Sequence, residues 1–237
     1  IGGSAGRSSA TAQGGYYVTK AACAKEGISL KDATFCIHGF GNAGSFAASI
    51  FAAEGCKIIG IADSRTAVYD PNGIDVALAK KIKAETGSLK DYPHGQQVTP
   101  DEILTSSCDI LVPASLEGVI NKDNAAQIKA KMIAELANGP VTPEADAELT
   151  ARGVVIVPDI LTNAGGVTVS YFEWVQNRMG YYWSAEEVQE KLEIAMTKAF
   201  NDIYLFKQEH HCEDYRLAAF AIAIQRIVQA MKDRGWL

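Results

Sequence analysis

Short apolar runs and segments with helical spacing alternate along most of the chain. Five β-prone apolar runs predict strands, and they cover residues 34–38, 57–62, 109–112, 132–135 and 154–157. Between and before them, helical spacing predicts helices over 8–26, 42–54 and 75–86. Two long helices are expected at the end of the chain, over 184–209 and 214–233. The first of them opens with a capping-box pattern, because Ser184 is followed three residues later by Glu187.

Strands that alternate with helices are joined as βαβ units, and these units build parallel sheets. We therefore expect an α/β fold of the Rossmann type: a doubly wound, mostly parallel sheet with helices on both faces and long C-terminal helices. One domain is expected over 1–237, with a linker and first helix in 1–30 and the C-terminal helices in 184–237. The opening Ile1-Gly2-Gly3-Ser4 is typical of a linker, so the chain is expected to be part of a longer protein.

Composition narrows the classes of function. The 22 basic and 28 acidic residues give a net charge of -6, unlike the basic surface of a nucleic-acid-binding protein, so no nucleic-acid partner is expected. No segment approaches the roughly 18 apolar residues that span a bilayer, and no signal peptide is visible, so no membrane partner is expected. The odd number of scattered cysteines predicts buried free thiols in a reducing, cytoplasmic compartment. Adjacent His210, His211 and Cys212 point in different directions on a helix, so no metal site is predicted.

The strongest local motif is a G-x-G-x-x-G sequence, formed by Gly39, Phe40, Gly41, Asn42, Ala43 and Gly44. It follows an apolar strand and opens a helix, which is the position that a dinucleotide-binding loop requires. In such loops the glycines permit a tight turn, a close approach of the backbone to a pyrophosphate, and close packing of helix and strand. Free N–H groups at the start of the helix then favour the phosphate charge.

The choice between two nicotinamide dinucleotides depends on the end of the second strand. Asp63 lies there, about 20 residues after the loop, where an acidic side chain accepts hydrogen bonds from the adenosine ribose. Its charge would repel a 2′-phosphate, which favours NAD. Ser64 and Arg65 follow at once, and an arginine at this point could hold the phosphate of NADP. NAD is the preferred interpretation, and NADP stays open.

Several longer strings along the chain are highly specific, above all Val157-Pro158-Asp159 and Asn163-Ala164-Gly165-Gly166-Val167, followed by Ser170. With these strings the chain resembles the glutamate dehydrogenase family of amino-acid dehydrogenases, nearly from end to end. The resemblance implies the NAD(P)-binding domain of an enzyme that oxidises glutamate to 2-oxoglutarate and ammonia. It further implies a small amino-acid or 2-oxo-acid substrate, a full-length homo-hexamer, and an N-terminal catalytic domain that is absent from this chain.

The same resemblance assigns roles to individual residues. Thr11 is expected to contact the nicotinamide carboxamide, and Asn163 to lie beside the nicotinamide ribose and the substrate. Val167 and Ser170 are expected to face the substrate, with the Ser170 hydroxyl near its side-chain carboxylate. The cofactor-binding set also includes the loop residues and Asp63, Ser64, Ala114 and Asn138. Local preferences leave alternatives: Thr11 on a helix surface, Asn163 as a helix cap, and Ser170 bonded to its own backbone.

No residue of this chain is predicted to act as the catalytic acid or base. In the family a lysine and an aspartate supply that chemistry, and both belong to the preceding domain. The lysines and His38 here offer no substitute, so the chain is expected to bind cofactor without turnover. Two other functions remain possible, a leucine, phenylalanine or valine dehydrogenase and a stand-alone nucleotide-binding module. Ser170 argues against the former, because those relatives lack a carboxylate-binding hydroxyl at this position.

The last predicted helix carries an apolar stripe at helical spacing, formed by Leu217, Phe220, Ala221, Ile224, Ile227, Val228 and Met231. Packing against the sheet or the preceding helix is the favoured interpretation. The alternative is a surface that moves against the absent domain and that would promote association when exposed.

Overall fold

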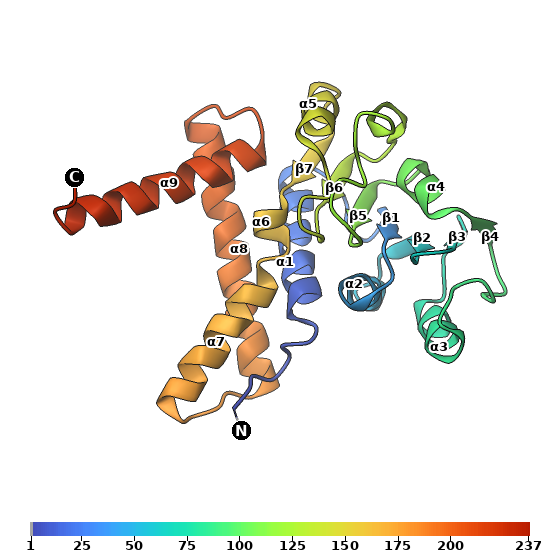
Figure 1. Cartoon of the computed structure of the whole chain (residues 1–237), viewed down its shortest axis with the longest axis horizontal. Helices are drawn as coiled ribbons and strands as arrows, with labels where there is room; N and C mark the ends of the chain where they lie inside the picture. The colour runs from blue at the N-terminus through green and yellow to red at the C-terminus, as the bar shows by residue number, and fades with distance from the viewer. Residues whose placement is uncertain (1) are drawn as a thin grey trace.

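The computed structural model describes residues 2–237, and its seven-stranded sheet has the order β4-β3-β2-β1-β5-β6-β7 (Figure 1). Five of these strands pair in parallel, namely β1 (Thr34–His38), β2 (Lys57–Ala62), β5 (Ile110–Pro113), β6 (Met132–Ala134) and β7 (Val155–Val157). The chain leaves β1 towards β2 on one side and later returns to β5 on the other. This arrangement confirms the doubly wound, mostly parallel α/β fold.

Two antiparallel strands at the β2 edge were not predicted. They are β3 (Ala67–Tyr69), which pairs with β2, and β4 (Gln96–Val98), which pairs with β3. Each is three residues long, too short to show an alternation of apolar and polar positions. The helix α4 (Pro100–Thr105), which follows β4, was missed for the same reason, although Thr99 and Glu102 form a capping box at its start.

Helices cover both faces of the sheet, as expected. Side chains of β1 alternate between two apolar cores, with Phe35 and Ile37 in the larger core and Cys36 in the smaller one. The larger core lies under α1 (Ala10–Lys25), α2 (Asn42–Ala53) and α3 (Val76–Thr86). The smaller core is covered by α4, η1 (Ala125–Gln127) and α5 (Pro143–Ala151).

The C-terminal part of the chain adds the helices α6 (Asp159–Thr162), α7 (Gly165–Met179), α8 (Ala185–Glu209) and α9 (Tyr215–Asp233). The capping box of Ser184 and Glu187 forms at the start of α8, as predicted. The length of α7 was not predicted from the spacing of its residues. It crosses α1, which also contacts α2 and α8, so α1 lies between the sheet and the C-terminal helices (Figure 1).

The apolar stripe of α9 does not pack into the core, so the favoured interpretation was wrong for most of its length. Leu217, Phe220, Ile224 and Ile227 are each at least 50% exposed. The first turns of α9 contact the body through Tyr215, Ala218 and Ala219, which are buried. Beyond them the helix extends outward and ends at the C-terminus (Figure 1).

Candidate functional site

A pocket of about 750 Å³ opens where the carboxyl ends of β1 and β5 meet. Its lining is formed by Arg7, Thr11, Ala43, Ala114, Ser115, Leu116, Glu117, Leu136, Ala137, Asn138, Asn163, Gly166, Val167 and Ser170. These residues come from the segment before α1, from α1, α2 and α7, from the loops after β5 and β6, and from the end of α6. Ligands of open α/β sheets bind in the crevice at such a topological switch point, because the loops on its two sides diverge there.

The glycine loop has the close backbone approach that its sequence predicts. A Cβ atom on Gly44 would lie 1.7 Å from the carbonyl oxygen of Gly39, so only glycine permits α2 to begin this close to β1. At Gly41 an added Cβ would meet nothing within 4 Å, which leaves open space beside the backbone. The Phe40 ring is buried in the core, and Asn42 is the first residue of α2. The loop can therefore offer backbone N–H groups, rather than the Phe40 ring, to a ligand.

The N-termini of three helices converge on the pocket. Thr11, Ala43 and Val167 lie in the first turns of α1, α2 and α7, and all three line it. Unpaired N–H groups and the helix dipole make such ends favourable for an anion. The Thr11 hydroxyl lies against α7, since a Cβ atom on Gly166 would be 2.5 Å from its oxygen. Thr11 is thus a pocket residue rather than a helix-surface residue.

Two asparagines from different loops meet at the pocket. The Asn163 side-chain amide donates to the Oδ1 atom of Asn138 at 2.7 Å, and its nitrogen lies 3.4 Å from the carbonyl oxygen of Ala137. Asn163 is the C-cap residue of α6, the alternative that its sequence left open, and its side chain bonds across to the β6 loop. The hydrogen bond between them joins the segments that follow β6 and β7 where both line the pocket.

Ser170 is bonded to its own backbone, which was the alternative that its sequence left open, and it also lines the pocket. Its hydroxyl donates to the carbonyl oxygen of Gly166 at 3.0 Å, one turn back on α7. The same oxygen accepts a hydrogen bond of 2.9 Å from Nε of Arg7. No role was predicted for Arg7 from the sequence. Its guanidinium brings a positive charge into the lining, where Glu117 brings a negative one.

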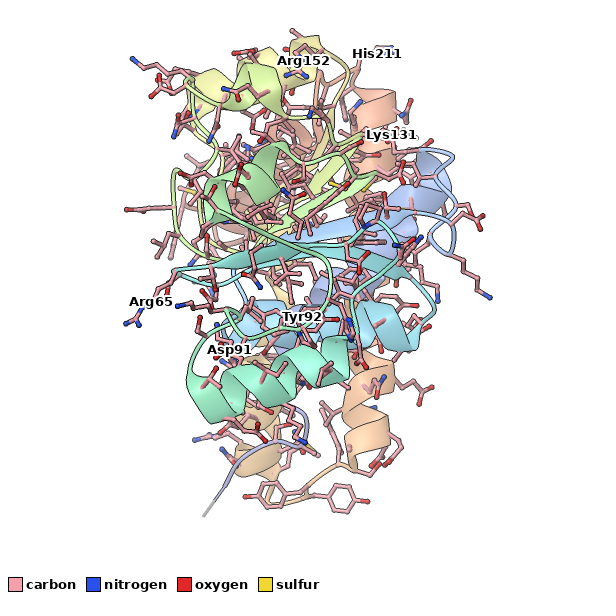
Figure 2. All side chains as sticks on the ribbon, turned by 90° about the vertical axis from the view of Figure 1, so that its right-hand side faces the viewer. Arg65, Asp91, Tyr92, Lys131, Arg152 and His211 are labelled. Carbon is pink, nitrogen blue, oxygen red and sulfur yellow. The ribbon has the colours of Figure 1, made fainter. Side chains whose placement is uncertain are left out.

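Asp63 and Ser64 do not line this pocket. The Asp63 side chain accepts hydrogen bonds from nearby backbone N–H groups. Its side chain is 2% exposed. One carboxylate oxygen accepts the backbone N–H groups of Arg65 and Thr66 at 2.8 Å each, and the other accepts that of Leu89 at 2.9 Å. Burial alone would raise the pKa of Asp63, but these donors and the nearby Lys83 lower it below its usual value. Ser64 and Arg65 are exposed, and Arg65 projects outward at the surface (Figure 2).

Two further kinds of site are absent from the described residues 2–237. No group of three or more histidine, cysteine, aspartate or glutamate side chains there is placed to hold a metal ion. None of the described helices has the length and apolar character to cross a bilayer.

Comparison with known proteins identifies a family whose members resemble this chain. The family model described as glutamate/leucine/phenylalanine/valine dehydrogenase matches residues 2–235. A glutamate dehydrogenase from Peptoniphilus asaccharolyticus is 39% identical over 100% of this chain, with a TM-score of 0.87. A hetero-hexameric glutamate dehydrogenase from Thermus thermophilus, solved with leucine bound, is 33% identical over 98% of this chain, with a TM-score of 0.92. The chain spans 56% and 55% of those two chains, respectively.

Proposed function

Since the chain belongs to the glutamate/leucine/phenylalanine/valine dehydrogenase family, we propose that it is the dinucleotide-binding domain of a glutamate dehydrogenase. The reaction would be the oxidative deamination of glutamate to 2-oxoglutarate and ammonia. The observation that carries this proposal is the pocket at the β1/β5 switch point, which brings Ala43 of the glycine loop together with Thr11, Asn138 and Asn163. Open space at Gly41 and three convergent helix N-termini fit a pyrophosphate bound across the loop.

The pocket residues would bind and orient rather than move protons. The Thr11 hydroxyl and the Asn163 amide are neutral hydrogen-bonding groups, suited to fixing the nicotinamide ring and its ribose. When bound, the cofactor accepts the hydride from the substrate. Arg7 and Ser170 lie 2.9 Å apart on the α7 side, where a guanidinium and a hydroxyl together suit a substrate carboxylate. The acid–base groups would come from a second domain, so this chain alone would bind without turnover.

NAD is proposed as the cofactor. The Asp63 carboxylate is charged at neutral pH and lies at the end of β2, where a negative charge disfavours a 2′-phosphate. Exposed Arg65 is the residue that would favour NADP instead.

The relatives and the thiols support proposals for the assembly and the location. The Thermus thermophilus relative is a hetero-hexamer, and we propose a homo-hexamer for the full-length protein. All five cysteines are free and four are buried, which fits a reducing compartment and a proposed cytoplasmic location.

Calorimetric titration of the chain with NAD and with NADP tests the proposal. We expect saturable binding of NAD that is stronger than that of NADP. Gly41→Val, which fills the open space of the loop, should weaken NAD binding at least about tenfold, or about 1.4 kcal/mol. Ala53→Val, at the exposed far end of the same helix, is the matched control and should bind as the original chain does. Absence of binding for both dinucleotides would overturn the proposal.

A further inference from the structure

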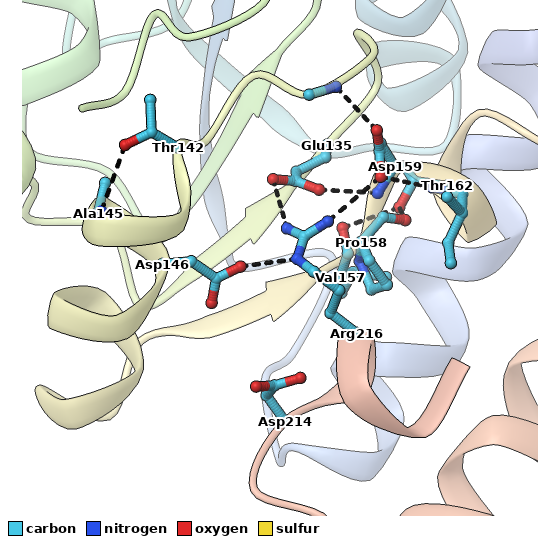
Figure 3. A network of polar contacts seen from close by, with 12 residues as sticks. Glu135, Thr142, Ala145, Asp146, Val157, Pro158, Asp159, Thr162, Asp214 and Arg216 are labelled. Carbon is cyan, nitrogen blue, oxygen red and sulfur yellow. Dashed lines mark hydrogen bonds and ion pairs between the residues drawn. The ribbon is translucent and has the colours of Figure 1, made fainter. Parts of the chain in front are cut away.

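Arg216 lies in the first turn of α9 and contacts three carboxylates at once (Figure 3). Its Nε atom donates to Asp146 at 2.7 Å, one terminal nitrogen to Glu135 at 2.8 Å, and the other to Asp159 at 3.2 Å. These carboxylates belong to α5, to the loop after β6 and to the first residue of α6. The Glu135 side chain is 0% exposed and that of Arg216 is 24% exposed, so most of this network is shielded from water.

Two of the carboxylates also hold backbone N–H groups. The second oxygen of Glu135 accepts the amide of Asp159 at 2.8 Å. The second oxygen of Asp159 accepts the amide of Gly139, also at 2.8 Å. The loops after β6 and β7 are therefore fastened to each other through Glu135 and Asp159, and both carboxylates are oriented by one guanidinium.

These same loops present the two asparagines of the pocket. Asn138 directly precedes Gly139, whose amide is held by Asp159. Asn163 donates its backbone amide to the carbonyl oxygen of Asp159 at 3.0 Å, and its side chain bonds Asn138 at 2.7 Å. A continuous series of contacts thus runs from α9 through Asp159 to both pocket asparagines, although Arg216 does not line that pocket.

We propose that Arg216 is a positioning residue of the dinucleotide pocket, which it serves by orienting Asp159 and Glu135 so that Asn138 and Asn163 face the ligand. This inference rests on the proposed function, since it assumes that the pocket takes a nicotinamide dinucleotide. It also places the start of α9, outside the sheet and its loops, in control of the pocket geometry.

A purely structural role would look different. Burial raises the pKa of Glu135 to about 7, while Arg216 and the Asp159 amide favour its charged form. If Arg216 only balanced that charge, a lysine would do, or both charges could be removed together. A positioning role requires the planar, forked guanidinium, because its three nitrogens each bond a different carboxylate, whereas the donors of an ammonium all radiate from one nitrogen.

The first test is the affinity for NADH, followed by the change in its fluorescence, for four forms of the 237-residue chain. Arg216→Lys and the double variant Arg216→Met with Glu135→Gln should each weaken binding about 3- to 30-fold, as residues without ligand contact do when they support a site. Arg226→Met is the matched control on the same helix, since its ion pair with Asp202 is exposed, and it should bind like the original chain. If Arg216→Lys or the double variant binds NADH with the same affinity as the original chain, the proposal is overturned.

The second test does not depend on a ligand. Hydrogen exchange of the Gly139 and Asp159 amides should accelerate in Arg216→Lys, while amides of β1 and α2 exchange as before. Uniform acceleration, or none, would show that Arg216 does not position these loops. If the original chain binds no dinucleotide while the local acceleration is seen, the proposed function fails and the positioning of the loops stands.

Discussion

Replacing Asp63 with asparagine tests whether this residue holds the turn after β2. The side chain is almost fully buried and accepts backbone N–H groups from Arg65, Thr66 and Leu89. Asparagine keeps the shape and one acceptor oxygen, which can still serve Arg65 and Thr66. It turns an NH₂ group towards the Leu89 amide, whose residue is 0% exposed. The variant therefore loses one charge-assisted bond and weakens two others.

The expected cost follows from these contacts. A buried donor left without a partner costs about 1–3 kcal/mol, and a hydrogen bond to a charged group contributes roughly 1 kcal/mol more than a neutral one. The free energy of unfolding should therefore fall by about 2–4 kcal/mol at pH 7. The folded-state pKa of Asp63 is lowered, so its stabilisation is present above the unfolded pKa of about 3.9. That stabilisation is lost as the pH falls through the folded pKa, and the difference between the two proteins should shrink in acid.

Urea unfolding followed by circular dichroism at pH 7, with a series of lower pH values, measures this difference. Asp91→Asn serves as the control, because Asp91 is exposed (Figure 2) and its replacement should change stability by less than about 0.5 kcal/mol. A loss below about 0.5 kcal/mol for Asp63→Asn, or a loss that does not depend on pH, would refute this role.

Three further predictions concern the C-terminal helices. A Cβ atom on Gly165 would lie 2.2 Å from the carbonyl oxygen of Ala10. Gly165→Ala should therefore force α1 and α7 apart and lower the free energy of unfolding by about 3 kcal/mol. An unchanged midpoint of urea unfolding would contradict this. Tyr215→Phe removes the hydrogen bond that the Tyr215 hydroxyl of α9 donates to Glu26, the C-cap residue of α1. The free energy of unfolding should fall by about 1–2 kcal/mol in the same assay. If it does not fall, α9 is held by packing alone. Ile224→Lys changes a side chain that is 59% exposed, so sedimentation should show less self-association at high concentration with unchanged stability.

Elements with a strong local signal were predicted closely. The strands β1 and β2 have the predicted bounds, and α8 begins at its capping box, because each is specified by its own apolar run or cap. The glycine loop was likewise recognisable, since the close approach of Gly44 to Gly39 is a local requirement. By contrast, β3 pairs with β2 across a short turn and β4 pairs with β3 from further along the chain, and a three-residue pattern reveals neither pairing.

The candidate site shows the same division. Thr11, Asn138, Asn163, Val167 and Ser170 were named from strings that resemble the family, and the structure brings all five to one pocket. The residues around Arg7 do not indicate its contact with Ser170, because 163 residues separate the two positions. The network of Arg216 was missed for the same reason, as its carboxylates lie 57 to 81 residues away in the sequence.

By itself the sequence determined the α/β alternation, the glycine loop and the family, since each depends on residues that are neighbours along the chain. The tertiary structure alone decided which side chains share the pocket, that Asp63 is held by its own turn, and that α9 extends outward with its apolar stripe exposed. The physical reason is that contacts between distant segments depend on how helices and strands pack. A periodic pattern shows that a face is apolar, but the partner that covers it is settled only when the whole chain has folded.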